Sequence, residues 1–143
     1  MSKVSQVLAK KGNQVWSIDP KSSVYEALQT MAEKNVGALL VLQSGKVKGI
    51  FSERDYARKV VLKDKSSRET LVDEIMTQNV VLISAEESIE DCMAKMSDHH
   101  IRHLPVMEDD KLIGIISIGD LVNFIISEQQ FKIDQLENYI QGS

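Results

Sequence analysis

The stretch Gly49–Asp55, GIFSERD, returns 65 residues later as Gly114–Asp120, GIISIGD. In each copy a β-favouring apolar run ends at a serine, and an aspartate follows three residues later. This order predicts a strand that runs directly into a helix, with Ser52 or Ser117 as the N-cap and the aspartate in the first turn. Such a junction either only caps its helix, or also offers hydroxyl, carboxylate and backbone N–H groups to a ribose phosphate.

The repeat extends far beyond this stretch. A shift of 65 residues aligns residues 15–61 with residues 80–126 without a gap. Identical pairs in this register are Val15/Val80, Ile18/Ile83, Ser23/Ser88, Met31/Met96, Leu39/Leu104, Val41/Val106 and Lys46/Lys111. A gap-free register of this length indicates an internal duplication of one unit.

The first copy gives the order of elements within the unit. A short strand is predicted at Val15–Ile18, and Ser23 caps an apolar helical stripe that follows it. Two strands, at Ala38–Leu42 and Val47–Phe51, flank a short turn, and a helix continues from Tyr56 to Leu62. The repeated unit is therefore β-α-β-β-α.

The charged segment between the copies divides the chain. Residues 1–70 are predicted to form the first unit with an N-terminal helix and a linker, residues 71–128 the second unit, and residues 129–143 an amphipathic tail. A unit of about 50 residues buries too little surface to be stable alone. We therefore expect an α/β (α+β) fold in which two units pack sheet to sheet about a pseudo-two-fold axis, with the junctions in related clefts.

The composition excludes several classes of protein. The 143 residues are 43% hydrophobic and 27% charged, as in a globular protein, and the net charge of −4 disfavours nucleic acid as a partner. No apolar run reaches the roughly 18–20 residues that a membrane span needs, and no hydrophobic segment typical of a signal peptide follows the N-terminus. A single cysteine suits a reducing compartment. We expect a cytoplasmic protein without a membrane partner.

The histidines and the cysteine are interpreted as structural. His99 and His103 have a spacing that binds metal on a helix, but the aligned segment of the first unit is a helix-to-strand turn, so no metal site is predicted. Cys92 aligns with Ala27 on the buried stripe and is predicted to be a small core residue. The sequence has no P-loop and no glycine-rich dinucleotide fingerprint, which argues against an enzyme.

Paired units that each end in Gly-hydrophobic-x-Ser-x-x-Asp, together with the lead-in Ile101–Val106 to the second central strand, resemble cystathionine-β-synthase (CBS) domains. A tandem pair is a Bateman module, similar to the regulatory insert of IMP dehydrogenase and to stand-alone CBS-pair proteins. The resemblance implies a non-enzymatic regulatory protein that binds AMP, ADP, ATP, NAD or S-adenosylmethionine and senses energy or redox state. It also implies a homodimer and a regulated partner protein.

The resemblance further implies which residues bind the ligand. Asp55 and Asp120 would accept ribose hydroxyls, and Ser52 and Ser117 would bond a phosphate or ribose oxygen. The adenine pocket would be lined by Ser17, Ile18, Val36, Gly37, Ala38, Leu82, Ile83, Ile101, Arg102 and His103, and Leu104 and Pro105 are included with them. The cations assigned to phosphates are Arg54, Arg58, Arg102 and His103, with arginine preferred because its fork matches phosphate oxygens.

The two copies differ where the ligand would bind. Gly37 aligns with Arg102, and Glu53-Arg54 aligns with Ile118-Gly119. We therefore expect two sites with different phosphate preferences. Two other readings stay open, namely a structural dimerisation module whose junctions are only caps, and an S-adenosylmethionine sensor.

Overall fold

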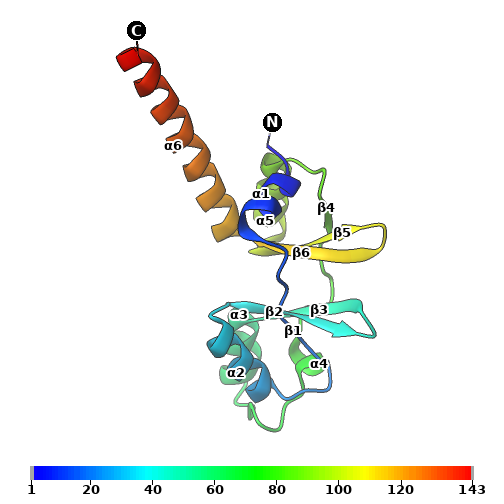
Figure 1. The fold of residues 1–143 in the computed structure, drawn as a ribbon. Helices are drawn as coiled ribbons and strands as arrows, with labels where there is room; N and C mark the ends of the chain where they lie inside the picture. Colours follow the sequence, from blue (N-terminus) through cyan, green and yellow to red (C-terminus); the bar gives the residue numbers. More distant parts are fainter. Residues whose placement is uncertain (1, 143) are drawn as a thin grey trace.

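The computed structural model describes residues 2–142 and contains two similar halves, each built on a three-stranded sheet (Figure 1). The sheet orders are β1-β2-β3 and β4-β5-β6, and in each the first strand is parallel and the third antiparallel to the central strand. The elements are α1 (Val4–Lys11), β1 (Ser17–Ile18), α2 (Val24–Lys34), β2 (Ala38–Gln43), β3 (Lys46–Ser52), α3 (Glu53–Tyr56), the π-helix η1 (Ala57–Val61), α4 (Val72–Ile75), β4 (Ile83–Ser84), α5 (Ile89–His99), β5 (His103–Glu108), β6 (Lys111–Ser117) and α6 (Ile118–Gly142). The predicted mixed fold of two β-α-β-β-α units is confirmed.

Tight turns fix the register of both hairpins. The β2–β3 turn has positive φ at Ser44 (52°) and Gly45 (77°), and the β5–β6 turn has positive φ at Asp109 (49°) and Asp110 (63°). Two successive residues with positive φ match the right-handed twist of the strands they join. Each hairpin therefore brings its last strand back beside the central one and ends at the serine of a junction.

Capping residues define the ends of the long helix in each unit. Ser23 begins α2 and Ser88 begins α5, and each side chain accepts a hydrogen bond of 3.1 Å from the backbone N–H three residues on. The C-cap residues of the two helices, Asn35 and His100, both have a left-handed backbone conformation. The predicted N-caps are confirmed, and each helix ends directly before a central strand.

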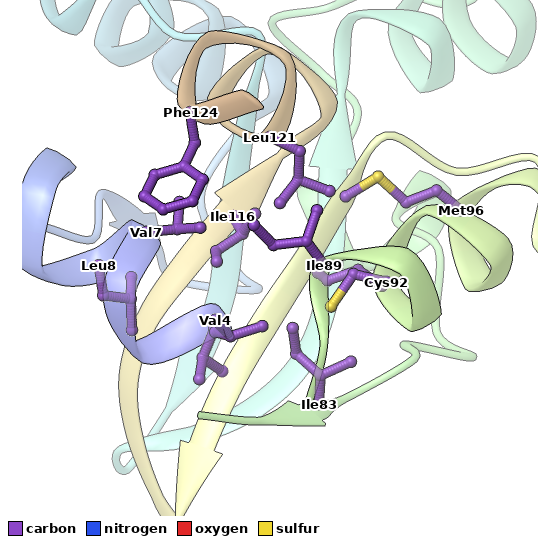
Figure 2. Packing of buried hydrophobic residues seen from close by; sticks show 12 residues of the cluster. Val4, Val7, Leu8, Ile83, Ile89, Cys92, Met96, Ile116, Leu121 and Phe124 are labelled. Carbon is purple, nitrogen blue, oxygen red and sulfur yellow. The ribbon is translucent and has the colours of Figure 1, made fainter. Parts of the chain in front are cut away.

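The two cores exchange the short helices that precede each unit. Val4, Val7 and Leu8 of α1 pack in the core of the second unit, as Figure 2 shows, although α1 comes before the first unit in the chain. Val72 and Ile75 of α4 pack in the core of the first unit. The division at residues 70 and 71 follows chain order and stays a prediction, because the packing of both helices crosses it.

The other face of each sheet turns toward the opposite unit. Leu39 and Val41 belong to the first core, whereas Leu40, between them, points to the opposite face of the sheet and is still completely buried. Pro105 is its equivalent in the second sheet and is also buried. Figure 1 shows the two sheets facing each other at the centre, with the helices on the outside.

The last helix, α6, runs for 25 residues without a break. Its first turns pack on the second unit through Leu121 and Phe124, and its remaining turns extend away from both units (Figure 1). The polar run Ser127–Gln130, which interrupts the apolar pattern of the sequence, does not end the helix. Among residues 2–142, no helix combines the length and apolar character needed to cross a membrane.

Candidate functional site

The first junction holds its aspartate with three hydrogen bonds and one ion pair. Asp55 Oδ2 accepts from the backbone N and the Oγ of Ser52, both at 3.0 Å. Its other oxygen, Oδ1, accepts from Thr77 Oγ1 at 3.1 Å and pairs with Lys59 Nζ at 3.0 Å. A carboxylate has about four lone-pair sites, so the three hydrogen bonds use most of them and Lys59 balances the charge. The predicted N-cap at Ser52 is present, and through Thr77 Asp55 also connects the junction to the chain that leads into the second unit.

The second junction repeats the cap but uses a different cation. Asp120 Oδ2 accepts from the Ser117 backbone N at 2.9 Å, and the Asp120 N–H donates to Ser117 Oγ at 3.0 Å. Lys11 of α1 reaches the same carboxylate oxygen at 2.6 Å and the Ile115 carbonyl at 2.8 Å. Burial alone would raise the pKa of Asp120, but the hydrogen bonds from Lys11 and Ser117 outweigh it and lower the pKa.

A cleft of about 710 Å³ lies between the two units beside the first junction. Its walls come from the end of β3, the start of α3, the chain before β4, the turn between α5 and β5, and the end of β6. Eight of the residues predicted to bind ligand meet there: Gly37, Ser52, Arg54, Asp55, Ile101, Arg102, His103 and Ser117. The lining also includes nine residues that were not predicted: Ile50, Glu53, Thr77, Asn79, Val80, Val81, His99, His100 and Ile118.

The other predicted residues lie outside this cleft. Leu104 is completely buried in the second core, where Ile83 also packs (Figure 2). Asp120 lies against Lys11, and Arg58 is exposed. The remaining residues outside the lining are Ser17, Ile18, Val36, Ala38, Leu82 and Pro105. A ligand role for any of these ten residues stays a prediction.

The unpredicted segment from Thr77 to Val81 is attached to β3 by a pair of backbone hydrogen bonds. Ile50 N donates to Thr77 O at 3.0 Å, and Thr77 N donates to Ile50 O at 2.9 Å. A side chain at Gly49 would leave only 2.7 Å between its Cβ and the Thr77 carbonyl. The glycine that begins the repeated stretch is thus the sequence signal for this close approach, although it does not reveal which segment approaches.

The lining of the cleft carries the two arginines Arg54 and Arg102 together with the carboxylates of Glu53 and Asp55. Arg54 Nη1 donates to the His100 carbonyl at 2.9 Å, which links the first junction to the end of α5 in the other unit. Arg102 is exposed and also lines the cleft. Desolvation lowers the pKa of His103, although the nearby Asp120 carboxylate opposes the shift. The rim therefore carries two arginines, together with a histidine that burial favours in its neutral form.

Pro105 changes the edge of the second sheet next to the cleft. In the first unit Leu40 N donates to Trp16 O at 3.2 Å, and β1 begins at Ser17. Pro105 occupies the position of Leu40 and has no N–H to donate to Val81, the equivalent of Trp16. Accordingly β4 begins one aligned position later, at Ile83, and Val81 is among the residues that line the cleft.

The predictions for the histidines and the cysteine can be compared with their positions. His99 ends α5 and His103 begins β5, so the two do not share a helix face. Within residues 2–142 no group of three or more His, Cys, Asp or Glu side chains is arranged to hold a metal. Cys92 is completely buried, as expected of a core residue, and burial raises the pKa of its thiol to about 11.

Two sheet-to-sheet β-α-β-β-α units that share a cleft define a tandem CBS-type module. The sequence pattern of the CBS domain matches residues 4–62 and again residues 72–127. The chain belongs to the CBS-domain family.

Relatives and solved structures agree with this assignment. CBS domain-containing protein CBSX3, mitochondrial, from Arabidopsis thaliana is 36% identical over 97% of this chain and 72% of its own length. A solved structure of a protein with CBS domains from Burkholderia ambifaria has a TM-score of 0.87 and 47% identity, covering 90% of this chain and 96% of its own. A CBS domain pair solved with 5′-methylthioadenosine and S-adenosyl-L-methionine has a TM-score of 0.78 and 24% identity, covering 90% of this chain and 98% of its own.

Proposed function

We propose that this protein is a non-enzymatic regulatory module that binds an adenosine nucleotide, such as AMP, ADP, ATP or NAD, in the cleft between its CBS units. One observation carries the proposal: a cleft of about 710 Å³ combines apolar walls with two arginines at its rim and receives residues from both units. A nucleotide has an apolar base and an anionic phosphate, and this lining complements both ends. The structural neighbour solved with 5′-methylthioadenosine and S-adenosyl-L-methionine supports an adenosine ligand.

The base is assigned to the inner part of the cleft. Val80, Val81 and Ile101 supply apolar surface there, and the Val81 carbonyl lacks the strand hydrogen bond that Pro105 cannot donate. That carbonyl is an acceptor suited to the exocyclic amino group of adenine. Guanine presents a carbonyl oxygen at the corresponding ring position, so the arrangement favours adenine over guanine.

The phosphates are assigned to the rim, where Arg54 and Arg102 come from different units. A phosphate held by both arginines would connect the first unit to the second with charge-assisted hydrogen bonds. S-adenosylmethionine carries a positive sulfonium and a single carboxylate, so a rim with two arginines favours nucleotides over it. Because Arg54 already donates to the His100 carbonyl, phosphate binding is coupled to the end of α5.

A ribose at Asp55 requires an exchange of partners. Three hydrogen bonds and the Lys59 ion pair already surround its carboxylate, so a ribose hydroxyl would compete with one of these partners. The Thr77 hydroxyl is the neutral side-chain donor, and it lies on the segment that lines the cleft. Ligand binding at this carboxylate would therefore release Thr77 and alter how the first unit holds the chain into the second.

The regulatory consequence follows from binding across two units. A ligand shifts the relative arrangement of the units only by as much as its binding free energy differs between their arrangements. We propose that a partner protein recognises this shift. Location in the cytoplasm remains part of the proposal.

Isothermal titration calorimetry with AMP, ADP, ATP, NAD, S-adenosylmethionine and GMP tests the proposal. We expect saturable binding of at least one adenine nucleotide below millimolar concentration, and weaker binding of GMP. A complete lack of binding by all five adenosine compounds at about millimolar concentration, where affinities correspond to only about 4 kcal/mol, would rule the proposal out.

The competing function is a structural module whose junctions only cap their helices. It is favoured by the Asp55 carboxylate, which already has protein partners on both of its oxygens. Asp55→Ala and Asp120→Ala distinguish the two readings by thermal unfolding with and without AMP. If the junctions only cap, each variant loses the same stability in both conditions. If the cleft binds nucleotide, Asp55→Ala also loses the stabilisation that AMP gives to the unmodified protein.

A further inference from the structure

The distal part of α6 exposes large apolar side chains. Residues 129–142 are all exposed to solvent, with exposed fractions of 48% at Ile133 and 63% at Leu136. Figure 1 shows this part of the helix extending beyond both units. An isolated helix of about 14 residues is only marginally stable in water, so tertiary or quaternary contacts normally stabilise one. The exposed apolar positions indicate where such contacts form.

These positions follow the seven-residue repeat of a coiled coil. The a positions are Ile126, Ile133 and Ile140, and the d positions are Val122, Gln129 and Leu136. Steps that alternate between three and four residues place all of them in one stripe along the helix, over about 28 Å. Isoleucine at a with leucine at d favours parallel two-stranded coiled coils.

The stripe is separate from the face of α6 that packs on its own unit. Leu121 and Phe124 point into the second core (Figure 2). Val122 and Ile126, in the same turns, remain 42% and 59% exposed. The stripe is therefore accessible from the start of α6 onward, and a second helix can lie along it without displacing the core contacts.

The charges beside the stripe complement a second copy of the same helix. Lys132 falls at a g position and Glu137 at the e position of the following heptad, five residues later. In a parallel pair, this spacing brings Lys132 of one copy beside Glu137 of the other, and two-fold symmetry repeats the contact. Within one helix, Lys132 and Glu137 are five residues apart and lie on different faces, so they cannot form an ion pair with each other. Their spacing instead suits an ion pair between two copies of the helix.

We propose that residues 122–140 of α6 pair with the same residues of a second copy of this chain as a parallel two-stranded coiled coil. The pairing would place both CBS modules at the same end of the coil. It rests on the heptad pattern, the exposed stripe and the charge complementarity, and it does not depend on nucleotide binding.

Sedimentation velocity of the full chain tests the proposal. Association of two copies depends on protein concentration, so the measurement is made at about 100 µM, where we expect a dimer. The double variant Ile133→Lys/Leu136→Lys should raise the dimer dissociation constant at least about 100-fold, since it removes four aliphatic side chains from the interface and adds four like charges. Phe131→Lys is the matched control: Phe131 is 58% exposed but lies outside the stripe, so this variant should remain dimeric.

Cysteine cross-linking tests the parallel register without introducing a charge. Gln129→Cys and Leu136→Cys each place a thiol opposite its own copy and should form interchain disulfides under mild oxidation, whereas Phe131→Cys should not. The native Cys92 is completely buried and should not contribute. Lys132→Glu should weaken the dimer, and adding Glu137→Lys should restore it.

Three results would overturn the proposal. They are a monomeric protein at about 100 µM, a dimer that survives Ile133→Lys/Leu136→Lys, and cross-linking of Phe131→Cys as fast as that of Leu136→Cys. If the double lysine variant fails to fold, as judged by circular dichroism, the cysteine variants decide between these outcomes.

Discussion

Lys11 Nζ lies 2.6 Å from Asp120 Oδ2, although 109 residues separate them in the chain. In the packing, α1 corresponds to α4 with a shift of 68 residues, since Leu8 lies against Gly114 as Met76 lies against Gly49, so the position equivalent to Lys11 is the uncharged Asn79. The charge of Asp120 at the second junction is thus balanced by Lys11, which belongs to a helix that precedes the first unit. Asp55 of the first junction instead pairs with Lys59, four residues along its own helix.

Lys11→Met should raise the pKa of Asp120 and destabilise the protein by about 1 kcal/mol near neutral pH. The folded pKa of Asp120 is lowered, so its contribution to stability is present above the unfolded pKa and is lost as pH falls through the folded pKa. The stability difference between the two proteins should therefore vanish in acid. Carbon-13 NMR titration and urea unfolding at several pH values measure both effects, and Lys10→Met is the control. An unchanged Asp120 titration would contradict the assignment.

Arg102→Ala should weaken AMP binding by about tenfold, because it removes a charge-assisted hydrogen bond from the rim of the cleft. Arg58→Ala is a suitable control, since Arg58 is exposed and lies outside the lining of this cleft. Calorimetry at low and high salt gives both the affinity and its electrostatic part. Equal losses in both variants would show that only overall charge matters.

His103 should make stability depend on pH just below neutrality. Desolvation lowers its pKa in the folded protein, so the unfolded chain binds more protons between that value and about 6.5. Stability should consequently fall as pH drops through this interval. His103→Gln should remove this part of the slope in urea unfolding, and His99→Gln should retain it. A slope that His103→Gln leaves intact would assign it to another group.

Gly49→Ala should destabilise the protein more than Gly114→Ala does, although the two glycines are equivalent in the repeat. A Cβ at Gly49 would lie 2.7 Å from the Thr77 carbonyl, whose backbone is fixed by its pairing with Ile50. At Gly114 it would meet the Leu8 side chain at 2.8 Å, which can change rotamer. We expect losses of about 2–3 and about 1 kcal/mol, respectively, in urea unfolding. The reverse order would contradict this account.

The repeat in the sequence predicts the fold because its signals are local. Ser52 and Ser117 cap helices with residues three positions away, and the hairpin turns are short. The contacts that distinguish the two junctions have no such signature. Lys11 reaches Asp120, and Thr77 reaches Asp55, only because each short helix packs on the unit that it does not precede. The sequence therefore predicts eight of the cleft residues, but not the segment at Thr77–Val81 that completes the lining.

The exchange of α1 and α4 also sets the order in which the protein can form during synthesis. The first core needs Val72 and Ile75, which follow it closely, so it can form soon after they leave the ribosome. The second core needs Val4, Val7 and Leu8 together with Phe124, which is synthesised more than 100 residues later. At about 5–20 residues per second, α1 waits several seconds for its partners. Its apolar face is then exposed to chaperones, or to the α1-binding surface of a neighbouring nascent chain.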